Sequence, residues 1–314
     1  MSQPIFVGVD VSKDTLDVCL LPSNEHFKVN YDPEGIKQLI QKLRPLPLQV
    51  IVMEATGGYE KRLAAELCAA GQDKIYIVNP RRIRDFARST GRLAKNDSLD
   101  ANILAFYGQI FQIKPQVLPS EAEEQLKDLV RRRQQLVNNR GAELNRLQQT
   151  STPYVSSSLK RIIRVLDKEI KALELHIQQI IKNNPVWYDK AESLQQVKGV
   201  GNTTACSLLA ALPELGQLNR REIAALAGLA PFDRDTGKFR GKRMISGGRA
   251  DARKALYMAT LAASKHNPVI SGFYQKLVRA GKPKKLALTA CMRKLLIFLN
   301  VILKNYNNSV CVNS

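Results

Sequence analysis

Short apolar runs separated by helical periods in the first eighty residues restrict this chain more than any other feature of its sequence. Five such runs predict strands, at residues 5–9, 15–21, 26–31, 48–53 and 74–78. Apolar residues at helical spacing between them predict helices that begin near Pro33 and Tyr59. The first three strands are joined by short turns and form an antiparallel meander, whereas the continuous fourth run indicates a buried strand. The pattern predicts an α/β domain at the N-terminus.

This element order, three strands, a helix, a strand, a helix, a strand and further helices, is that of the RNase H-like fold. Acidic residues stand where such sheets present ligands and catalysts: Asp10 ends the first strand and Glu54 ends the fourth. Asp97 and Asp100 stand where the next helix begins, at a spacing that places both on one helix face. Four converging carboxylates repel one another unless divalent cations neutralise them, and hard oxygen ligands favour Mg²⁺ or Mn²⁺. We therefore predict a site for two metal ions suited to phosphoryl transfer.

Each acid also has an ordinary structural interpretation. Asp97 is suited to capping a helix, and Asp10 and Asp14 are suited to turns. Glu54 has no obvious structural task, because it ends a buried strand and precedes Ala-Thr-Gly-Gly. Taken together in this element order, the four acids favour the metal site.

A basic segment lies between the last predicted strand and the acidic pair. Its cations recur at helical spacing: Arg81, Arg82, Arg84 and Arg88. We expect one basic face beside the acids, which suits phosphate groups, and an ordinary solvated helix face is the alternative.

The charge of the whole chain supports a polyanionic partner. Lys and Arg number 48 against 28 Asp and Glu, which gives a net charge of +20, and nucleic acid is favoured over a merely basic protein. The five cysteines have no CxxC spacing and the three histidines are scattered, which argues against zinc and disulfides and indicates a reducing compartment. The N-terminus lacks a signal-peptide pattern. The apolar stretch 286–303 contains Arg293 and Lys294, so we expect a packed amphipathic helix and no membrane partner.

The middle of the chain predicts two long helices, one over residues 121–149 and one after the break at 150–158. Their apolar residues recur at near-heptad spacing, which indicates an antiparallel coiled-coil hairpin. Self-association is its expected use, and a helical spacer is the alternative. The predicted domains are therefore 1–115, catalytic; 116–190, coiled-coil linker and oligomerisation; and 191–314, a mostly α C-terminal domain.

Two features of the C-terminal domain suit contact with DNA phosphates. Residues 194–205 carry a helix, Gly-x-Gly, helix pattern similar to a helix-hairpin-helix module, in which we expect Lys198, Gly199 and Gly201 to meet the backbone. A plain helix turn is the alternative. Residues 232–249 form a loop dense in glycine and cations that suits a scissile phosphate: Lys238, Arg240, Lys242, Arg243 and Arg249.

Three motifs together resemble one known family: residues 8–13 (GVDVSK), 54–59 (EATGGY) and 95–101 (KNDSLDA). They are similar to the blocks of the DEDD transposases of the insertion-sequence 110 family, and the chain looks closest to the 1111 group. The resemblance covers about residues 4–300. It implies a domain like the Holliday-junction resolvase RuvC, with Asp10, Glu54, Asp97 and Asp100 as metal ligands.

The family resemblance also implies a hydroxyl nucleophile near the C-terminus. In the family a serine in a Ser-Gly step, a few residues after a proline, attacks DNA and becomes transiently linked to a phosphate. Aligned on Pro231 and Gly237, that position is Thr236 here, which departs from the pattern. A threonine hydroxyl can act as a nucleophile, but its β-branch restricts rotamers and crowds in-line attack. Ser246, in the same basic loop, is the runner-up.

The resemblance further implies the partners. It predicts donor and target DNA, guidance by a structured bridge RNA of the element, and a dimer or tetramer in which the hydroxyl of one subunit meets the carboxylates of another. It places the protein in the bacterial cytoplasm at the nucleoid.

The predicted function is therefore a DNA transposase or recombinase. A site-specific DNA invertase of the same family is the nearest alternative. A RuvC-like junction resolvase that uses only the acidic site, and a non-catalytic nucleic-acid-binding protein, are the others.

Overall fold

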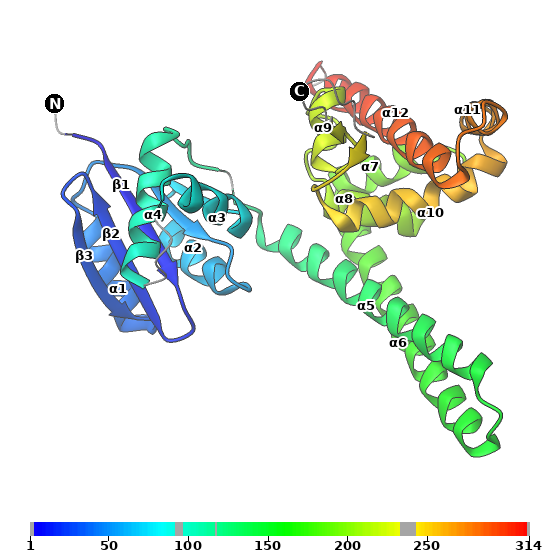
Figure 1. The fold of residues 1–314 in the computed structure, drawn as a ribbon, viewed down its shortest axis with the longest axis horizontal. Helices are drawn as coiled ribbons and strands as arrows, with labels where there is room; N and C mark the ends of the chain where they lie inside the picture. Colours follow the sequence, from blue (N-terminus) through cyan, green and yellow to red (C-terminus); the bar gives the residue numbers. More distant parts are fainter. Residues whose placement is uncertain (1–2, 92–96, 117, 233–242, 313–314) are drawn as a thin grey trace. The chain divides into compact units, whose positions relative to one another are not determined.

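The computed structural model describes residues 3–91, 97–116, 118–232 and 243–312, except for the side chains of 97–99 and 310–312. The chain divides into two compact units, Met1–Leu118 and Pro119–Ser314. Each is described by itself (Figure 1). The region 116–190, predicted from the sequence as a separate linker, falls almost wholly within the second unit. The three functional regions stay a prediction.

The first unit is built on a five-stranded mixed sheet, which confirms the predicted α/β domain (Figure 1). Its strands are β1 (Ile5–Val11), β2 (Thr15–Leu21), β3 (Glu25–Asn30), β4 (Leu48–Glu54) and β5 (Ile75–Val78). They lie in the order β3-β2-β1-β4-β5, with β2 antiparallel to both of its neighbours. Strand β4 runs parallel to β1 and β5, so the carboxyl ends of these three strands meet at one edge of the sheet.

Helices cover both faces of this sheet. They are α1 (Pro33–Leu43), α2 (Tyr59–Ala69), α3 (Pro80–Ser89) and α4 (Asp97–Ile110). Val7 and Val9 of β1 pack in one core with residues of α1 and α2. Phe6 packs in a second core with residues of α3 and α4. Because side chains alternate along a strand, Gly8 and Asp10 lie on the same face as Phe6, toward α4.

Gly8 allows α4 to lie directly on β1. A Cβ atom built at Gly8 would stand 2.0 Å from the carbonyl oxygen of Ala101 and 2.5 Å from the amide nitrogen of Ala105. Both groups are helix backbone and cannot rotate out of the way. The glycine therefore sets the distance between the helix and the strand.

We expect Gly8→Ala to lower the free energy of unfolding of the first unit by about 3 kcal/mol, because the added methyl group overpacks a helix–strand contact that cannot relax. Urea unfolding followed by circular dichroism measures the change. Gly141→Ala is the matched control, because Gly141 lies within a helix and a Cβ there meets nothing within 4 Å. It should raise stability by about 0.5–1 kcal/mol. Equal stabilities for Gly8→Ala and the unaltered protein would contradict this account of the contact.

The second unit begins with two long helices, α5 (Glu121–Gln149) and α6 (Pro153–Asn183). Ser120 starts α5 with a capping box: its side chain accepts from the Glu123 amide, and the Glu123 carboxylate accepts from the Ser120 amide. The two helices pack along each other and are linked by ion pairs, Arg133 with Glu174 and Arg140 with Asp167. Arg140 lies after Arg133 on α5, whereas its partner Asp167 lies before Glu174 on α6. The two helices therefore run antiparallel.

Six further helices complete the described part of the second unit: α7 (Pro185–Gln195), α8 (Asn202–Ala211), α9 (Arg220–Leu226), α10 (Ala250–His266), α11 (Pro268–Arg279) and α12 (Lys284–Val312). They share one hydrophobic core with the beginning of α5 and the end of α6. Within the described residues, one stretch, Lys284–Ser309 of α12, is long and apolar enough to cross a membrane by length and composition alone. Half of its apolar window is buried inside the unit, and Leu295, Leu296 and Leu299 are fully covered.

Candidate active site

The ends of β1 and β4 bring two of the predicted acids side by side. Val9 of β1 is paired with Met53 of β4 in parallel register, and the next residue on each strand is Asp10 and Glu54. Both are half-buried. Parallel neighbours share a face, so both acids lie on the α4 face of the sheet, at the edge where the strands end.

Helix α4 brings its N-terminal end to the same edge. Near its C-terminal end, Gly108 lies against Phe6 and Val52, whereas Ala101 lies against Gly8, farther along β1. The helix therefore runs antiparallel to β1, and its first turn, which contains Asp100, reaches the end of the strand that carries Asp10.

The electrostatics of Glu54 support this placement. Burial raises the pKa of the Glu54 carboxyl, the Arg84 guanidinium lowers it, and the negative charge of Asp100 raises it again. Glu54 is thus close enough to both residues to sense their charges. Two neighbouring carboxylates supply oxygen donors of the kind that hard divalent cations prefer, so the chemistry of these side chains suits the predicted metal.

The structure thus brings Asp10, Glu54 and Asp100 to one edge. The backbone of Asp97 opens α4, but its side chain lies outside the described residues. Among the side chains that the structure describes, no group of three or more His, Cys, Asp or Glu is arranged to hold a metal ion. The set of four ligands and the two metal ions therefore stay predictions.

The sequence interpretation missed two charged residues in the same row of the sheet. Asp17 on β2 is paired with Asp10, and Lys28 on β3 is paired with Asp17. The Lys28 ammonium lies 2.9 Å from the Asp17 carboxylate. Like charges directly opposite on neighbouring strands are destabilising, and the lysine offsets the charge that Asp17 adds beside Asp10. The alternation of polar and apolar residues over 15–21 is the signal that could have placed Asp17 on this face.

Helix α3 presents the predicted basic face. All four arginines are exposed on it: Arg81, Arg82, Arg84 and Arg88. The helix begins after Asn79, whose side chain accepts a hydrogen bond from the Arg81 amide. Phe86 holds it against α4, because its ring centre lies 5.3 Å from that of Tyr107. The charge of Arg84 acts on Glu54, one of the acids. Phosphate contact by this helix stays a prediction.

In the Gly-x-Gly turn between α7 and α8, the first glycine is required by the packing of the turn against α10. Gly199 has a φ of +101°, and a Cβ there would stand 2.6 Å from the Ala263 amide nitrogen of α10. Gly201, which caps α8, has nothing within 4 Å of a Cβ position, and the Lys198 side chain is exposed. The turn is therefore packed on one side and open on the other, as phosphate contact requires.

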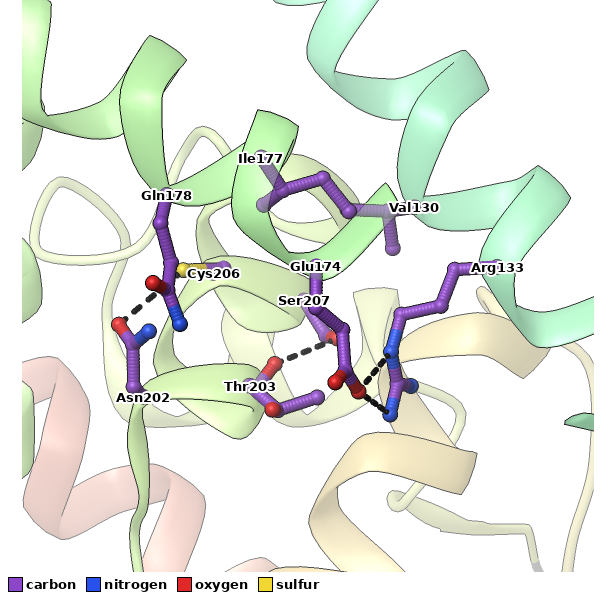
Figure 2. A pocket seen from close by; sticks show the side chains of 9 residues that line it. All are labelled: Val130, Arg133, Glu174, Ile177, Gln178, Asn202, Thr203, Cys206 and Ser207. Carbon is purple, nitrogen blue, oxygen red and sulfur yellow. Dashed lines mark hydrogen bonds and ion pairs between the residues drawn. The ribbon is translucent and has the colours of Figure 1, made fainter. Parts of the chain in front are cut away.

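A small pocket lies beside this turn, between α5, α6 and α8 (Figure 2). Arg133 of α5 donates to the Glu174 carboxylate of α6 at 2.5 and 2.7 Å, and the Ser207 hydroxyl donates to the Thr203 carbonyl at 2.7 Å. The first pair of bonds links α5 to α6 and the second lies within α8, so these polar groups of the wall are satisfied by the protein itself. We assign the pocket no catalytic role.

The basic loop is flanked by a short ladder that the sequence did not predict. Strands β6 (Pro231–Phe232) and β7 (Met244–Ile245) pair antiparallel. Ser246 follows β7 directly and is exposed, as is Arg243. Four further predicted residues of the loop lie outside the described part of the chain: Thr236, Lys238, Arg240 and Lys242.

Arg249 has a structural task beside its predicted one. Its guanidinium donates to both carboxylate oxygens of Glu214, at 2.6 and 2.7 Å, and to the Ala211 carbonyl at 2.9 Å. Its amide donates to the Leu226 carbonyl. Burial opposes ionisation of Glu214, but the hydrogen bonds and charge of Arg249 lower the pKa of this carboxyl overall. Arg249 therefore fixes the end of the basic loop on α9, and its contact with nucleic acid stays a prediction.

We expect Arg249→Glu to destabilise the second unit, because it places two carboxylates together, and Arg249→Glu combined with Glu214→Arg to recover part of the loss. The pair is about one-third exposed, so its contribution is about 1 kcal/mol, or about 2–4 °C in melting temperature. Calorimetry measures both variants. Because the folded-state pKa of Glu214 is lowered, this contribution is present at neutral pH and is lost as the pH falls through that pKa. A double variant no more stable than Arg249→Glu would contradict the pairing.

Comparisons with known proteins agree with this geometry. Residues 7–154, which include the acidic edge, match the DEDD family of IS110 described as Transposase, and residues 191–275 match the family described as Transposase IS116/IS110/IS902. Together with the α/β unit and its acidic edge, these matches define a DNA recombinase of the transposase class. The chain belongs to the IS110 family of DEDD transposases.

The chain is similar to relatives of two kinds. The chain is 28% identical over 314 residues to the pilin gene-inverting proteins of Moraxella bovis and Moraxella lacunata, with 95% of each chain covered. It is 22% identical to the transposase for insertion sequence element IS1111A of Coxiella burnetii, over 74% of this chain and 70% of that protein. The predicted resemblance to the family is confirmed.

Proposed function

We propose that this recombinase cuts and rejoins DNA strands with an acidic site of Asp10, Glu54, Asp97 and Asp100 and a hydroxyl from the C-terminal unit. The observation that carries the proposal is the meeting of Asp10, Glu54 and the first turn of α4 at one sheet edge, inside the region that matches the DEDD transposases. The strand order and the two covered faces support an RNase H-like domain of the RuvC kind.

In this proposal the carboxylates hold two Mg²⁺ or Mn²⁺ ions. When bound, such ions neutralise a phosphate and stabilise both the attacking and the leaving oxygen of an in-line displacement. Arg84, beside Glu54, orients the DNA phosphate at the edge. Lys28 keeps the added charge of Asp17 from repelling the phosphate.

The Thr236 hydroxyl then attacks the scissile phosphate. One oxygen–phosphorus bond forms to the side chain and one breaks; the threonine hydroxyl gives up its proton, and the leaving DNA oxygen takes one up and becomes a free hydroxyl end. Attack by the hydroxyl end of another strand reverses the exchange and joins DNA to DNA. Each step replaces one phosphate ester by another, so strand exchange needs no external energy source. Ser246 is the alternative nucleophile.

Guidance by a bridge RNA and assembly into a dimer or tetramer are part of the proposal. The net charge of +20 supports more than one nucleic-acid partner. We expect a defined structured RNA to accompany the protein when it is purified from its native host, and sequencing of the bound nucleic acid measures it. Recovery of random cellular RNA alone would contradict guidance.

A site-specific invertase is the second candidate, and the similarity to pilin gene-inverting proteins over 95% of both chains favours it. The chemistry is the same, and only the arrangement of the recombined sites differs. A plasmid that carries the native flanking DNA separates the two. An invertase reorients the segment between two sites, whereas a transposase releases the element as a circle or inserts it elsewhere.

A further inference from the structure

The final helices carry an unbalanced positive charge. Residues 252–314 contain eleven Lys and Arg and no Asp or Glu. Residues 121–195, which are also helical, contain thirteen Lys and Arg and ten Asp and Glu. The charge of the chain is therefore concentrated near its C-terminus, where no acid along the chain offsets it.

Five of these cations gather where α11 meets α12, and we call this cluster the basic corner. All five side chains are exposed: Lys276, Arg279, Lys282, Lys284 and Lys285. None of them forms an ion pair with a residue in the described part of the chain. Lys276 and Arg279 are three residues apart on α11 and share one face. Like charges at this distance destabilise a folded chain, so the corner costs stability unless an anion occupies it.

The backbone holds the basic corner in a fixed shape. Gly281 has a φ of +75°, and its amide and that of Lys282 donate to carbonyls of the last turn of α11, at 3.0 and 3.1 Å. Ile270 anchors α11 in the core with 3% of its surface exposed. The Lys294 ammonium of α12 lies 4.5 Å from the centre of the Phe273 ring of α11, which ties the two helices together. Because the backbone of the turn is already ordered, binding costs mainly the entropy of the long side chains themselves.

We propose that the basic corner binds the phosphate backbone of duplex DNA, in addition to the phosphate contacts already predicted. The proposal rests on the proposed function, which supplies duplex DNA as the substrate. Lysines act on phosphates as point charges and read no bases, so the contact positions DNA independently of sequence.

The composition of the corner favours a duplex over a single strand. Proteins that bind single strands combine a basic groove with aromatic rings on which bases stack. The nearest aromatic residues along α11, Phe273 and Tyr274, pack against the hydrophobic core instead. The corner therefore offers charge without a stacking surface, which fits a regular phosphate backbone.

Salt dependence of binding tests the proposal. The full-length protein and its variant Lys282→Ala, Lys284→Ala, Lys285→Ala are titrated with a fluorescent duplex between about 50 and 200 mM salt. Loss of three phosphate contacts should lower the slope of log K against log salt by about 2.7, since each contact contributes about 0.9. The matched control is Lys160→Ala, Lys168→Ala, Lys171→Ala, which removes three exposed lysines from α6. Its slope should equal that of the unaltered protein.

Several results would overturn the proposal. If the two triple variants have equal salt slopes, the basic corner is an ordinary solvated surface that does not contact DNA. A loss of affinity for a structured RNA, with duplex DNA binding intact, would assign the corner to RNA. If the variant binds duplex DNA normally but no longer binds vesicles of anionic lipid, the corner is a membrane-binding surface. All titrations are made without divalent cations, so a failure of the proposed cleavage chemistry leaves this result unaffected.

Discussion

Replacing Glu54 by glutamine is expected to abolish strand cleavage and to leave the fold and DNA binding intact. Glutamine has the same shape, and Glu54 is only half-buried at the end of β4, so the sheet has no reason to rearrange. The carboxylate is the group that holds the cation against the phosphate in our proposal. The loss of that electrostatic stabilisation amounts to several kcal/mol, which lowers the rate about a thousandfold or more.

Single-turnover cleavage of supercoiled DNA in Mg²⁺ measures the effect, and filter binding of the same DNA measures affinity. Glu66→Gln is the matched control, because it makes the same chemical change at an exposed position of α2, which covers the opposite face of the sheet. It should cut at the normal rate. Normal cleavage by Glu54→Gln would remove this residue from the mechanism and favour a non-catalytic nucleic-acid-binding protein.

Replacing Thr236 by alanine is expected to abolish the covalent link between protein and DNA, and with it strand joining, because the attacking oxygen is removed. Thr236→Ser should maintain or raise the rate, since serine keeps the hydroxyl and lacks the β-branch that restricts in-line attack. The protein–DNA adduct is measured on a denaturing gel after reaction with a suicide substrate. Together the two variants separate the hydroxyl from the size of the side chain.

Ser246→Ala provides the comparison, because Ser246 is an exposed hydroxyl at the end of β7. If Ser246→Ala loses the adduct and Thr236→Ala keeps it, the nucleophile is Ser246. If Thr236→Ala still cuts four-way junctions and neither variant changes the products, the protein is a hydrolytic junction resolvase.

The strands and the edge at which the acids meet could be predicted because they depend on local patterns. Continuous apolar residues specify β4, and the element order of the RNase H-like fold indicates that it lies beside β1, so Asp10 and Glu54, at the ends of the two strands, could be expected to come together. The placement of α4 is less local. It depends on Gly8, whose missing side chain lets the helix lie on β1, and the sequence alone does not show which helix that space receives.

Contacts between particular side chains of distant segments could not be predicted. Arg249 looks like a phosphate ligand in the sequence because its neighbours are basic, but its charge is matched by Glu214, which lies 35 residues earlier in the chain. Asp17 differs, because the predicted pairing of β2 with β1 places it beside Asp10 and the sequence interpretation overlooked it. The pairing of β6 with β7 could not be predicted, because each strand has two residues, too few for a periodic pattern.

The central claim is that the acids at the edge of the sheet hold divalent cations against a DNA phosphate. Calorimetric titration of the DNA complex of the full-length protein with Mn²⁺ tests it most directly. The account predicts about two ions for each active site, and predicts that Asp100→Asn loses at least one of them while it still binds DNA. Equal Mn²⁺ binding by Asp100→Asn and the unaltered protein would contradict the account.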